Sequence, residues 1–325
     1  MLRREHFINQ LPHTLQSIEL PFLGDKIAGK VRDSFIVGDK RVLITSDRLS
    51  AFDRILTTIP FKGQILNCMA AYWFDLTRHI VDNHLIAQPH PNVLITQQVK
   101  IVPVELVVRG YLTGSAGRDY EAGRAVSGVM LPRGLKKFQR FETPIITPST
   151  KAEHGQHDEP ISVEEVLSRG IVEEQYWREI CRIALELFEF GSAKSRERGL
   201  ILVDTKYEFG LLALADGSKK IVLADEIHTP DSSRYWMAES YQDRFDRGEE
   251  PQMLDKEHFR RWLISLGYMG EGTPPAIPDE MRIELAWRYA EACELVTGQP
   301  LEVNVGPAED AIGLAVKATL ASGTL

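Results

Sequence analysis

Residues 200–227 read LILVDTKYEFGLLALADGSKKIVLADEI, and this stretch decides the fold because it has the pattern of two adjacent β-strands. In its first half, Asp204, Lys206 and Glu208 alternate with uncharged residues. Successive side chains of a strand point to opposite faces, so the three ionisable groups share one face. Charge at strand spacing inside an apolar run indicates a functional face. The alternative is a solvent-facing strand that carries scattered charge.

The turn of this hairpin is predicted at Asp216-Gly217, because an Asp-Gly pair between apolar runs is a strong hairpin signal. If these two residues are the centre of the turn, Glu208 lies directly opposite Asp225. Opposed carboxylates with Cβ atoms about 4.5–5.5 Å apart repel each other and need compensation. We therefore predict that Glu208 and Asp225 hold Mg²⁺, whose remaining ligands are phosphate oxygens.

The composition is that of a globular protein, with 325 residues, 43% hydrophobic and 26% charged. The net charge of −8 argues against nonspecific nucleic-acid binding, which needs a basic surface. Cys68, Cys181 and Cys293 have no paired spacing, so neither a disulfide framework nor a zinc site is expected. No apolar run approaches the length of a membrane span, and the N-terminus lacks a signal-like apolar region, so we expect a cytoplasmic protein without membrane partners.

The pattern along the chain predicts an α+β fold with antiparallel sheets and flanking helices. The predicted organisation is a β-rich N-terminal lobe, residues 1–105, and a C-terminal α+β lobe, residues 106–325. Apolar residues at helical spacing predict helices at residues 65–85, 173–198, 256–266, 279–297 and 308–322. Strands are predicted at residues 25–37, broken at Gly29, and at 41–45 and 93–108.

Residues 29–33, GKVRD, lie between two short strand patterns. Glycine allows a close approach of the backbone, and Lys30 and Arg32 supply positive charge, which suits a hairpin that covers phosphates. The motif has neither Walker nor Rossmann spacing, so a plain tight turn with solvated charges is equally compatible with it.

Residues 106–120, LVVRGYLTGSAGRDY, pass from an apolar strand into a loop with Arg109 and Ser115 and then into a predicted helix. Free amides at a helix N-terminus and a nearby arginine suit a phosphate. The alternative is an N-cap serine with an arginine in a surface ion pair.

Residues 144–162 are polar and contain Lys151, His154, His157 and Asp158. We predict a long loop that closes over a charged substrate, and we favour this over a metal site because no regular spacing organises the histidines. Residues 229–234, TPDSSR, follow the second strand of the hairpin, where Asp231 and Arg234 offer groups for hydroxyls and phosphate. The alternative for this segment is a cap for a helix beginning near Trp236.

Six segments of the chain occur in the order seen in the SAICAR synthetase family. They are GKVRDSF, SDRLSAFD, VVRGYLTGS, TPSTKAEHGQHD, VDTKYEFG and ADEIHTPDSSRYW, spread over residues 29–236. The chain resembles the longer, fungal-like form of the family in residues 128–151. The resemblance implies a two-lobed fold related to ATP-grasp and kinase-like enzymes, with ATP in the interlobe cleft.

The resemblance also implies an activity. Members of the family are ligases of de novo purine biosynthesis that use ATP and Mg²⁺ to join carboxyaminoimidazole ribonucleotide (CAIR) to L-aspartate. The products are SAICAR, ADP and phosphate, formed through an acyl phosphate. We expect small-molecule substrates only, and a monomer is favoured over a homo-oligomer.

Roles carried over by matching position fall into three groups. The resemblance implies that ATP is bound by Gly29, Lys30, Val31 and Arg32 over its phosphates and by the strand from Val102 to Glu105 at its adenine. It implies that Lys206, Glu208 and Asp225 are catalytic, with Lys206 near the reacting carboxylate and the two carboxylates on Mg²⁺. Substrate binding is assigned to Arg109, Ser115 and Arg234 at the ribonucleotide phosphate, Asp231 at its ribose or imidazole, and Lys151, His157 and Asp158 at aspartate.

Two other functions remain open at this point. A small-molecule kinase would share Lys30, Glu208 and Asp225 but would need a base near an acceptor hydroxyl. A nonenzymatic nucleotide-binding protein would be expected to lack a metal carboxylate or the central lysine, whereas Lys206, Glu208 and Asp225 are all present.

Overall fold

The computed structural model describes residues 2–52, 54–151, 159–254 and 257–322, and its chain divides into two compact units. Unit 1 comprises residues 1–72, 84–98 and 254–325, and unit 2 comprises residues 73–83 and 99–253. These units differ from the predicted lobes, because residues 254–325 group with the N-terminal part of the chain. In both units the described strands pair antiparallel, so the predicted α+β class is confirmed.

Unit 1 is built on a five-stranded sheet in the order β1-β2-β3-β7-β6. Its strands are β1 (Ile27–Ala28), β2 (Arg32–Val37), β3 (Lys40–Thr45), β7 (Val93–Gln97) and β6 (Leu85–His90). Phe35, Val42, Ile44 and Ile95 of this sheet form one core with Ile312 of α9 (Glu309–Ala321). The remaining elements of the unit are β4 (Arg48–Ala51), β5 (Arg54–Thr58), α1 (Arg4–Gln10), η1 (Leu11–His13), η2 (Pro21–Leu23), α7 (Glu257–Ser265) and α8 (Asp279–Thr297).

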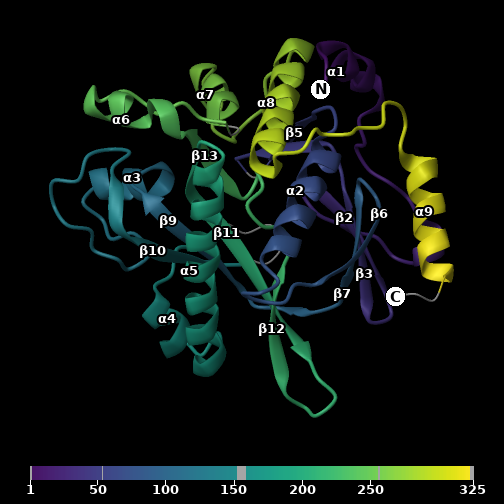
Figure 1. Cartoon of the computed structure of the whole chain (residues 1–325), viewed down its shortest axis with the longest axis horizontal. Coiled ribbons are helices and arrows are strands. Elements are labelled where there is room, and N and C mark those ends of the chain that lie inside the picture. Colours follow the sequence, from purple (N-terminus) through teal and green to yellow (C-terminus); the bar gives the residue numbers. More distant parts are fainter. Residues whose placement is uncertain (1, 53, 152–158, 255–256, 323–325) are drawn as a thin grey trace. The chain divides into compact units, whose positions relative to one another are not determined.

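Unit 2 holds the charged strand. Its sheet runs β10-β9-β11-β12, and β13 and β8 also pair with β11. The strands are β8 (Lys100–Ile101), β9 (Val104–Tyr111), β10 (Arg140–Thr150), β11 (Leu200–Ala213), β12 (Lys219–Ala224) and β13 (Ser233–Met237). Figure 1 shows α5 (Glu174–Glu197) running along these strands, which it contacts at β9, β10 and β11. The shorter helices are α3 (Gly114–Glu121), α4 (Val163–Ser168) and α6 (Ala238–Asp246).

Strand β11 changes its neighbours halfway along its length. Its first half pairs with β9 and β13, and its second half pairs with β12 and β8. On one edge, β12 ends at Ala224 opposite Glu208 and β13 begins at Ser233 opposite Thr205. Residues 225–232 therefore leave the sheet beside Lys206, whose backbone N–H donates to the carbonyl of Ser232 at 2.9 Å.

The predicted register of the hairpin is wrong by one residue. Glu208 pairs with Ala224, not with Asp225. The reason is a three-residue loop, residues 215–217, in which Leu214 and Ser218 form the last backbone pair and Gly217 adopts φ of +84°. A type I turn closed by a glycine in the left-handed region gives this loop length, whereas a two-residue loop gives the predicted register.

The long helices match the sequence pattern, and two other predictions are wrong. α2 (Lys62–Leu76) ends before residue 85, and residue 83 instead forms a bridge with Leu223 of the unit 2 sheet. The predicted loop at residues 144–162 is a strand as far as Thr150, because β10 pairs with β9 through residue 150. β10 lies at the sheet edge, where Pro144 and Pro148 are tolerated.

Candidate functional site

The charged residues of β11 do share one face, as the period of two predicts. Lys206 lies between two carboxylates, with its Nζ 2.8 Å from Oε1 of Glu105 on β9 and 3.1 Å from Oε1 of Glu208. Lys151, at the end of β10, forms an ion pair with the other oxygen of Glu208. Four side chains from three strands thus meet in one charged network.

This network keeps Lys206 and Glu208 charged. Burial disfavours the carboxylate of Glu208, but the ammonium groups of Lys206 and Lys151 outweigh burial and lower the pKa of Glu208 to about 2. Burial likewise disfavours the Lys206 ammonium, yet Glu208, Glu105 and Asp225 raise the pKa of Lys206 above its ordinary value. Lys206 therefore offers a fixed positive charge and not a proton-transfer group near pH 7.

Asp225 joins the network through Lys206. It follows β12 directly, with a backbone φ of +60°, and its charge acts on the Lys206 ammonium. Glu208 and Asp225 thus flank the same lysine although they are not opposed in the ladder. Among the described residues no group of three or more His, Cys, Asp or Glu side chains could hold a metal. Two carboxylates suit Mg²⁺ only where other ligands, such as phosphate oxygens, complete its shell.

A second cluster on the same face surrounds Asp204. Its Oδ2 accepts hydrogen bonds from Arg109 on β9 at 3.2 Å and from Arg234 on β13 at 2.6 Å. Arg109 also donates to the hydroxyl of Ser115 at 3.1 Å, and the Arg234 guanidinium lies against Gly114. The three residues predicted at a phosphate, Arg109, Ser115 and Arg234, are therefore brought together, and Asp204 orients both arginines.

Arg109 is the more deeply placed of the two arginines. Its side chain is 10% exposed, and burial lowers the pKa of its guanidinium against the opposing effect of Asp204. The N-cap of α3 is Thr113, whose side chain makes no capping hydrogen bond. Both parts of the alternative interpretation, an N-cap serine and a surface ion pair, are therefore wrong.

Two residues of this cluster were not among the predicted site residues. Asp204 belongs to the alternating charged pattern of β11, but the sequence did not indicate which side chains it contacts. Thr147 of β10 accepts a hydrogen bond from Arg109 Nε at 2.8 Å, and only the strand character of residues 144–150 could have placed it there.

The segment before β13 is a tight loop. A helix does follow near Trp236, as α6 from Ala238 onward, but β13 lies between it and residues 229–232, and the N-cap is Met237, so this loop does not cap the helix. The Asp231 backbone N–H donates to the hydroxyl of Thr229 at 3.3 Å, and Thr229 in turn donates to Glu226 at 2.5 Å. Asp231 is half-buried within this loop, next to the strand that carries Arg234.

His228 is a packing residue. It is fully buried, its Nε2 lies 2.6 Å from the hydroxyl of Tyr207, and its ring packs against Trp73 and Gly191. Burial lowers the pKa of His228 to about 3, so the imidazole is neutral in the folded protein near pH 7.

Residues 29–31, predicted to cover phosphates, form the turn between β1 and β2 in unit 1. The Gly29 N–H donates to the Arg32 carbonyl at 2.7 Å, and a Cβ at Gly29 would lie 2.9 Å from that oxygen. Buried Arg48 binds the carbonyls of Gly29 and Lys30 at 3.0 Å each, which holds the turn from one side. Val31 is anchored by its own carbonyl, which accepts from Ser46.

The remaining predicted residues fall into two groups. Val102 is buried and donates its N–H to the Phe209 carbonyl at 2.8 Å, while the side chain of Glu105 is committed to Lys206. His157 and Asp158, and with them His154, lie outside the described residues.

Comparisons with known proteins address the identity of the chain. A family model described as SAICAR synthetase matches residues 25–275. The phosphoribosylaminoimidazole-succinocarboxamide synthase of Legionella pneumophila (strain Paris) is 47% identical over 311 residues, which cover 93% of this chain and 97% of the relative. The chloroplastic protein of that name from Arabidopsis thaliana is 45% identical over 306 residues, covering 92% of this chain and 73% of the relative.

Solved structures give the same result. The SAICAR synthase of Saccharomyces cerevisiae, solved with SAICAR, superposes with a TM-score of 0.77 at 31% identity and covers 89% of this chain and 100% of its own. A SAICAR synthetase solved in complex with ADP has a TM-score of 0.65 at 26% identity, with 86% and 100% covered. The fold and the relatives place the chain among the ligases of purine biosynthesis. The chain belongs to the SAICAR synthetase family, as its motifs predicted.

Proposed function

We propose that this chain is an ATP-dependent ligase that joins CAIR to L-aspartate and releases SAICAR, ADP and phosphate. The family model and the relatives support the reaction. The main structural support for the proposal is the position of Lys206. It lies between Glu105 and Glu208 on the same sheet face as Arg109 and Arg234. One face thus combines a metal-type carboxylate, a fixed ammonium group and a pair of arginines.

The ribonucleotide phosphate is assigned to Arg109, Ser115 and Arg234. Guanidinium groups form forked, charge-assisted hydrogen bonds with phosphate oxygens. Arg234 is 22% exposed and Arg109 is 10% exposed, so a bound phosphate would meet a pre-formed charge whose orientation Asp204 sets. Asp231, in the loop just before β13, is assigned to the ribose or imidazole part of the same substrate.

Glu208 and Asp225 are assigned to Mg²⁺, which would neutralise charge on the ATP phosphates. Both are hard oxygen donors beside one lysine, and Glu208 stays ionised because its pKa is about 2. ATP is implied by the relative solved with ADP. Binding of Mg²⁺ would require the Lys151 ion pair with Glu208 to open, which the 41% exposure of the Lys151 side chain permits.

The proposed chemistry has two steps. A carboxylate oxygen of CAIR attacks the γ-phosphorus of ATP, and ADP leaves, which gives an acyl phosphate. The aspartate nitrogen then attacks the acyl carbon, loses a proton, and expels phosphate as the amide forms. Lys206 is assigned to hold the CAIR carboxylate in line and to balance the charge that develops on the transferred phosphoryl group.

Other assignments rest on the family resemblance. Gly29, Lys30, Val31 and Arg32 are assigned to the ATP phosphates, and the strand from Val102 to Glu105 to adenine. The Glu105 side chain binds Lys206, so a contact of this residue with adenine would come from its backbone. Lys151, His157 and Asp158 are assigned to aspartate. A monomeric state and a cytoplasmic location stay predictions from the sequence; no helix in the described part of the chain has the length and hydrophobicity of a membrane span.

The experiment is ADP release by the purified protein with ATP, Mg²⁺ and CAIR, with and without L-aspartate. The proposal expects ADP release that depends on aspartate and equals the SAICAR formed. Release of ADP that is indifferent to aspartate would instead favour a kinase or an ATPase.

A further inference from the structure

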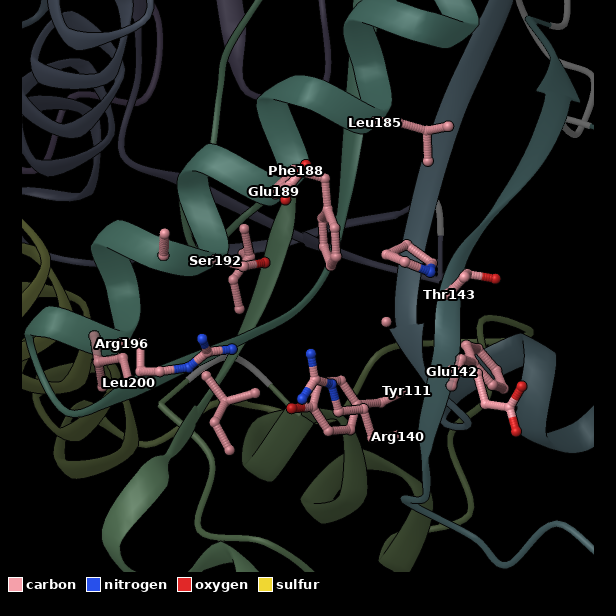
Figure 2. Close-up of a pocket in the computed structure, with 16 residues that line it drawn as sticks. Tyr111, Arg140, Glu142, Thr143, Leu185, Phe188, Glu189, Ser192, Arg196 and Leu200 are labelled. Carbon is pink, nitrogen blue, oxygen red and sulfur yellow. The ribbon is translucent and has the colours of Figure 1, made fainter.

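A cavity of about 500 Å³ lies in unit 2 between α5 and the strands β9, β10 and β11 (Figure 2). It is on the face of the sheet that α5 covers. A Cβ at Gly110 would lie 3.1 Å from Phe188 of α5, whereas the neighbouring Arg109 points to Asp204 on the other face. None of the residues of the Asp204 cluster lines the cavity, so it is separate from the proposed ribonucleotide site.

An irregularity in the sheet forms this cavity. Arg140 pairs with Tyr111 and Ile145 pairs with Arg109, so residues 141–144 of β10 face Gly110 alone. The extra residues bulge away from β9, and Gly110 has no side chain to fill the space. A volume of this size falls in the range of small-molecule pockets, about 300–1,000 Å³.

Two arginines line this cavity from opposite walls. Arg140 comes from β10 and Arg196 from the last turn of α5, and Figure 2 shows both guanidinium groups extending toward the side of the cavity where Tyr111 lies. Burial raises the pKa of the Tyr111 phenol, and the charges of Arg140 and Arg196 both act against that rise. The charges of both arginines therefore reach the phenol across the cavity.

The charge of these arginines is not balanced locally. Neither Arg140 nor Arg196 forms an ion pair with any residue that the structure describes, although Glu142 and Glu189 also line the cavity. Figure 2 shows the Glu142 carboxylate pointing away from both guanidinium groups. The hydroxyl of Ser192 is buried at the cavity wall and has no hydrogen-bond partner among the described residues. Two cations without an ion-pair partner among the described residues, on one cavity, suit an anion with several acceptor oxygens.

We propose that this cavity is a second ligand site, which binds a small phosphate-bearing molecule with a flat apolar body. Arg140, Arg196 and Tyr111 take the phosphate, and the apolar body lies against Phe188 and Leu185. A purely inorganic anion would leave the apolar wall in contact with water, so the body contributes to binding. This inference does not depend on the proposed function.

The test uses a reporter placed inside the cavity. Ala193 lines the cavity and is exposed, so an Ala193→Cys variant can be alkylated with iodoacetamide and its rate followed by mass spectrometry of the α5 peptide. Phenyl phosphate is the probe, and phenol and inorganic phosphate are tested separately. Glu186→Cys, exposed on the same helix but outside the cavity, reports any effect on the reagent itself.

Phenyl phosphate is expected to slow alkylation of Ala193→Cys about fivefold or more, with phenol inactive, inorganic phosphate weaker, and Glu186→Cys unaffected. Adding Arg140→Gln and Arg196→Gln should abolish this protection, and adding Arg178→Gln, an exposed arginine elsewhere on α5, should leave it intact. The Arg140→Gln/Arg196→Gln protein should keep its ligase activity, which shows that it is folded. Absent protection, or equal protection without the two arginines, would overturn the proposal.

Discussion

Lys206 and Glu208 lie two residues apart on β11, and the ammonium nitrogen of Lys206 is 3.1 Å from a carboxylate oxygen of Glu208. The pair is possible because strand geometry puts alternate residues on one face. Glu105 on the neighbouring strand completes the lysine's surroundings at 2.8 Å. The site therefore contains a lysine whose charge is fixed, beside the carboxylate that we assign to Mg²⁺.

Glu208→Gln should lower kcat by about 10²–10³-fold, because the amide cannot supply the charge that Mg²⁺ requires. Binding of CAIR, measured by calorimetry, should weaken only modestly because the arginine cluster is intact. Glu186→Gln, at an exposed ion pair of α5, is the matched control and should be unchanged. A kcat close to that of the parent protein would contradict the assignment of Glu208 to Mg²⁺.

Arg234→Met should raise KM for CAIR by about 10-fold or more and leave KM for ATP nearly unchanged, because a charge-assisted contact with the phosphate is lost. Steady-state kinetics with each substrate varied in turn separates the two constants. The control is Arg247→Met, at an exposed ion pair of the same unit. An equal rise in both constants would point to a general disturbance of the sheet.

Asp204→Asn should destabilise the fold by about 3 kcal/mol, because Arg109 and Arg234 would lose their shared counter-charge in a buried setting. Urea unfolding gives the free energy. Asp119→Asn, at a more exposed ion pair with Arg124, should cost little. If the two variants proved equally stable, Asp204 would not be the residue that balances the arginine cluster.

The stability of the protein should depend on pH through His228. The pKa of His228 is about 3 in the folded protein, and its ordinary value, which applies to the unfolded chain, is 6.5. Between these two pH values the unfolded chain therefore binds a proton that the folded chain does not bind. Stability is therefore complete above pH 6.5 and falls as the pH drops, by about 1.4 kcal/mol per pH unit from this group.

His228→Asn isolates this contribution, since asparagine tolerates the φ of +52° at this position. Carboxylates titrate alike in both proteins, so the difference between their unfolding free energies at pH 7, 6 and 5 should shrink as the pH falls. A constant difference would mean that His228 is not the group responsible.

Gly29→Ala should raise KM for ATP several-fold and leave KM for CAIR unchanged. The added methyl group would lie 2.9 Å from the Arg32 carbonyl, so the hairpin must shift. Ala28→Ser, at the exposed neighbouring position, is the control. An unchanged KM for ATP would separate this hairpin from the nucleotide.

Much of the fold followed from periodicity. The helices at residues 174–197 and 279–297 carry long apolar stripes, and the polar face of β11 followed from the period of two. The register of the hairpin could not be predicted in this way, because a loop of two residues and a loop of three residues are both compatible with the same Asp-Gly pair. That single residue decided whether Asp225 lies in the ladder or leaves it.

The candidate residues could be predicted from the sequence, but the contacts between them could be predicted only in part. Arg109, Ser115 and Arg234 were predicted from their segments and lie together in the structure, but their common partner Asp204 depends on the pairing of β11 with both β9 and β13. Thr147 was not predicted, because a segment with two prolines and several hydroxyl groups has the composition of a loop. Among strands, only an edge strand tolerates such prolines, and β10 is one. Partners across strands come from tertiary pairing, which local patterns do not contain.

The most direct measurement follows oxygen from CAIR labelled with ¹⁸O in its carboxylate. If the carboxylate attacks ATP and phosphate leaves from the acyl carbon, the phosphate released with SAICAR carries one labelled oxygen and the amide keeps the other. Mass spectrometry of the phosphate should therefore show one ¹⁸O atom for each SAICAR formed. Unlabelled phosphate, formed together with SAICAR, would contradict the acyl phosphate and with it the role assigned to Lys206.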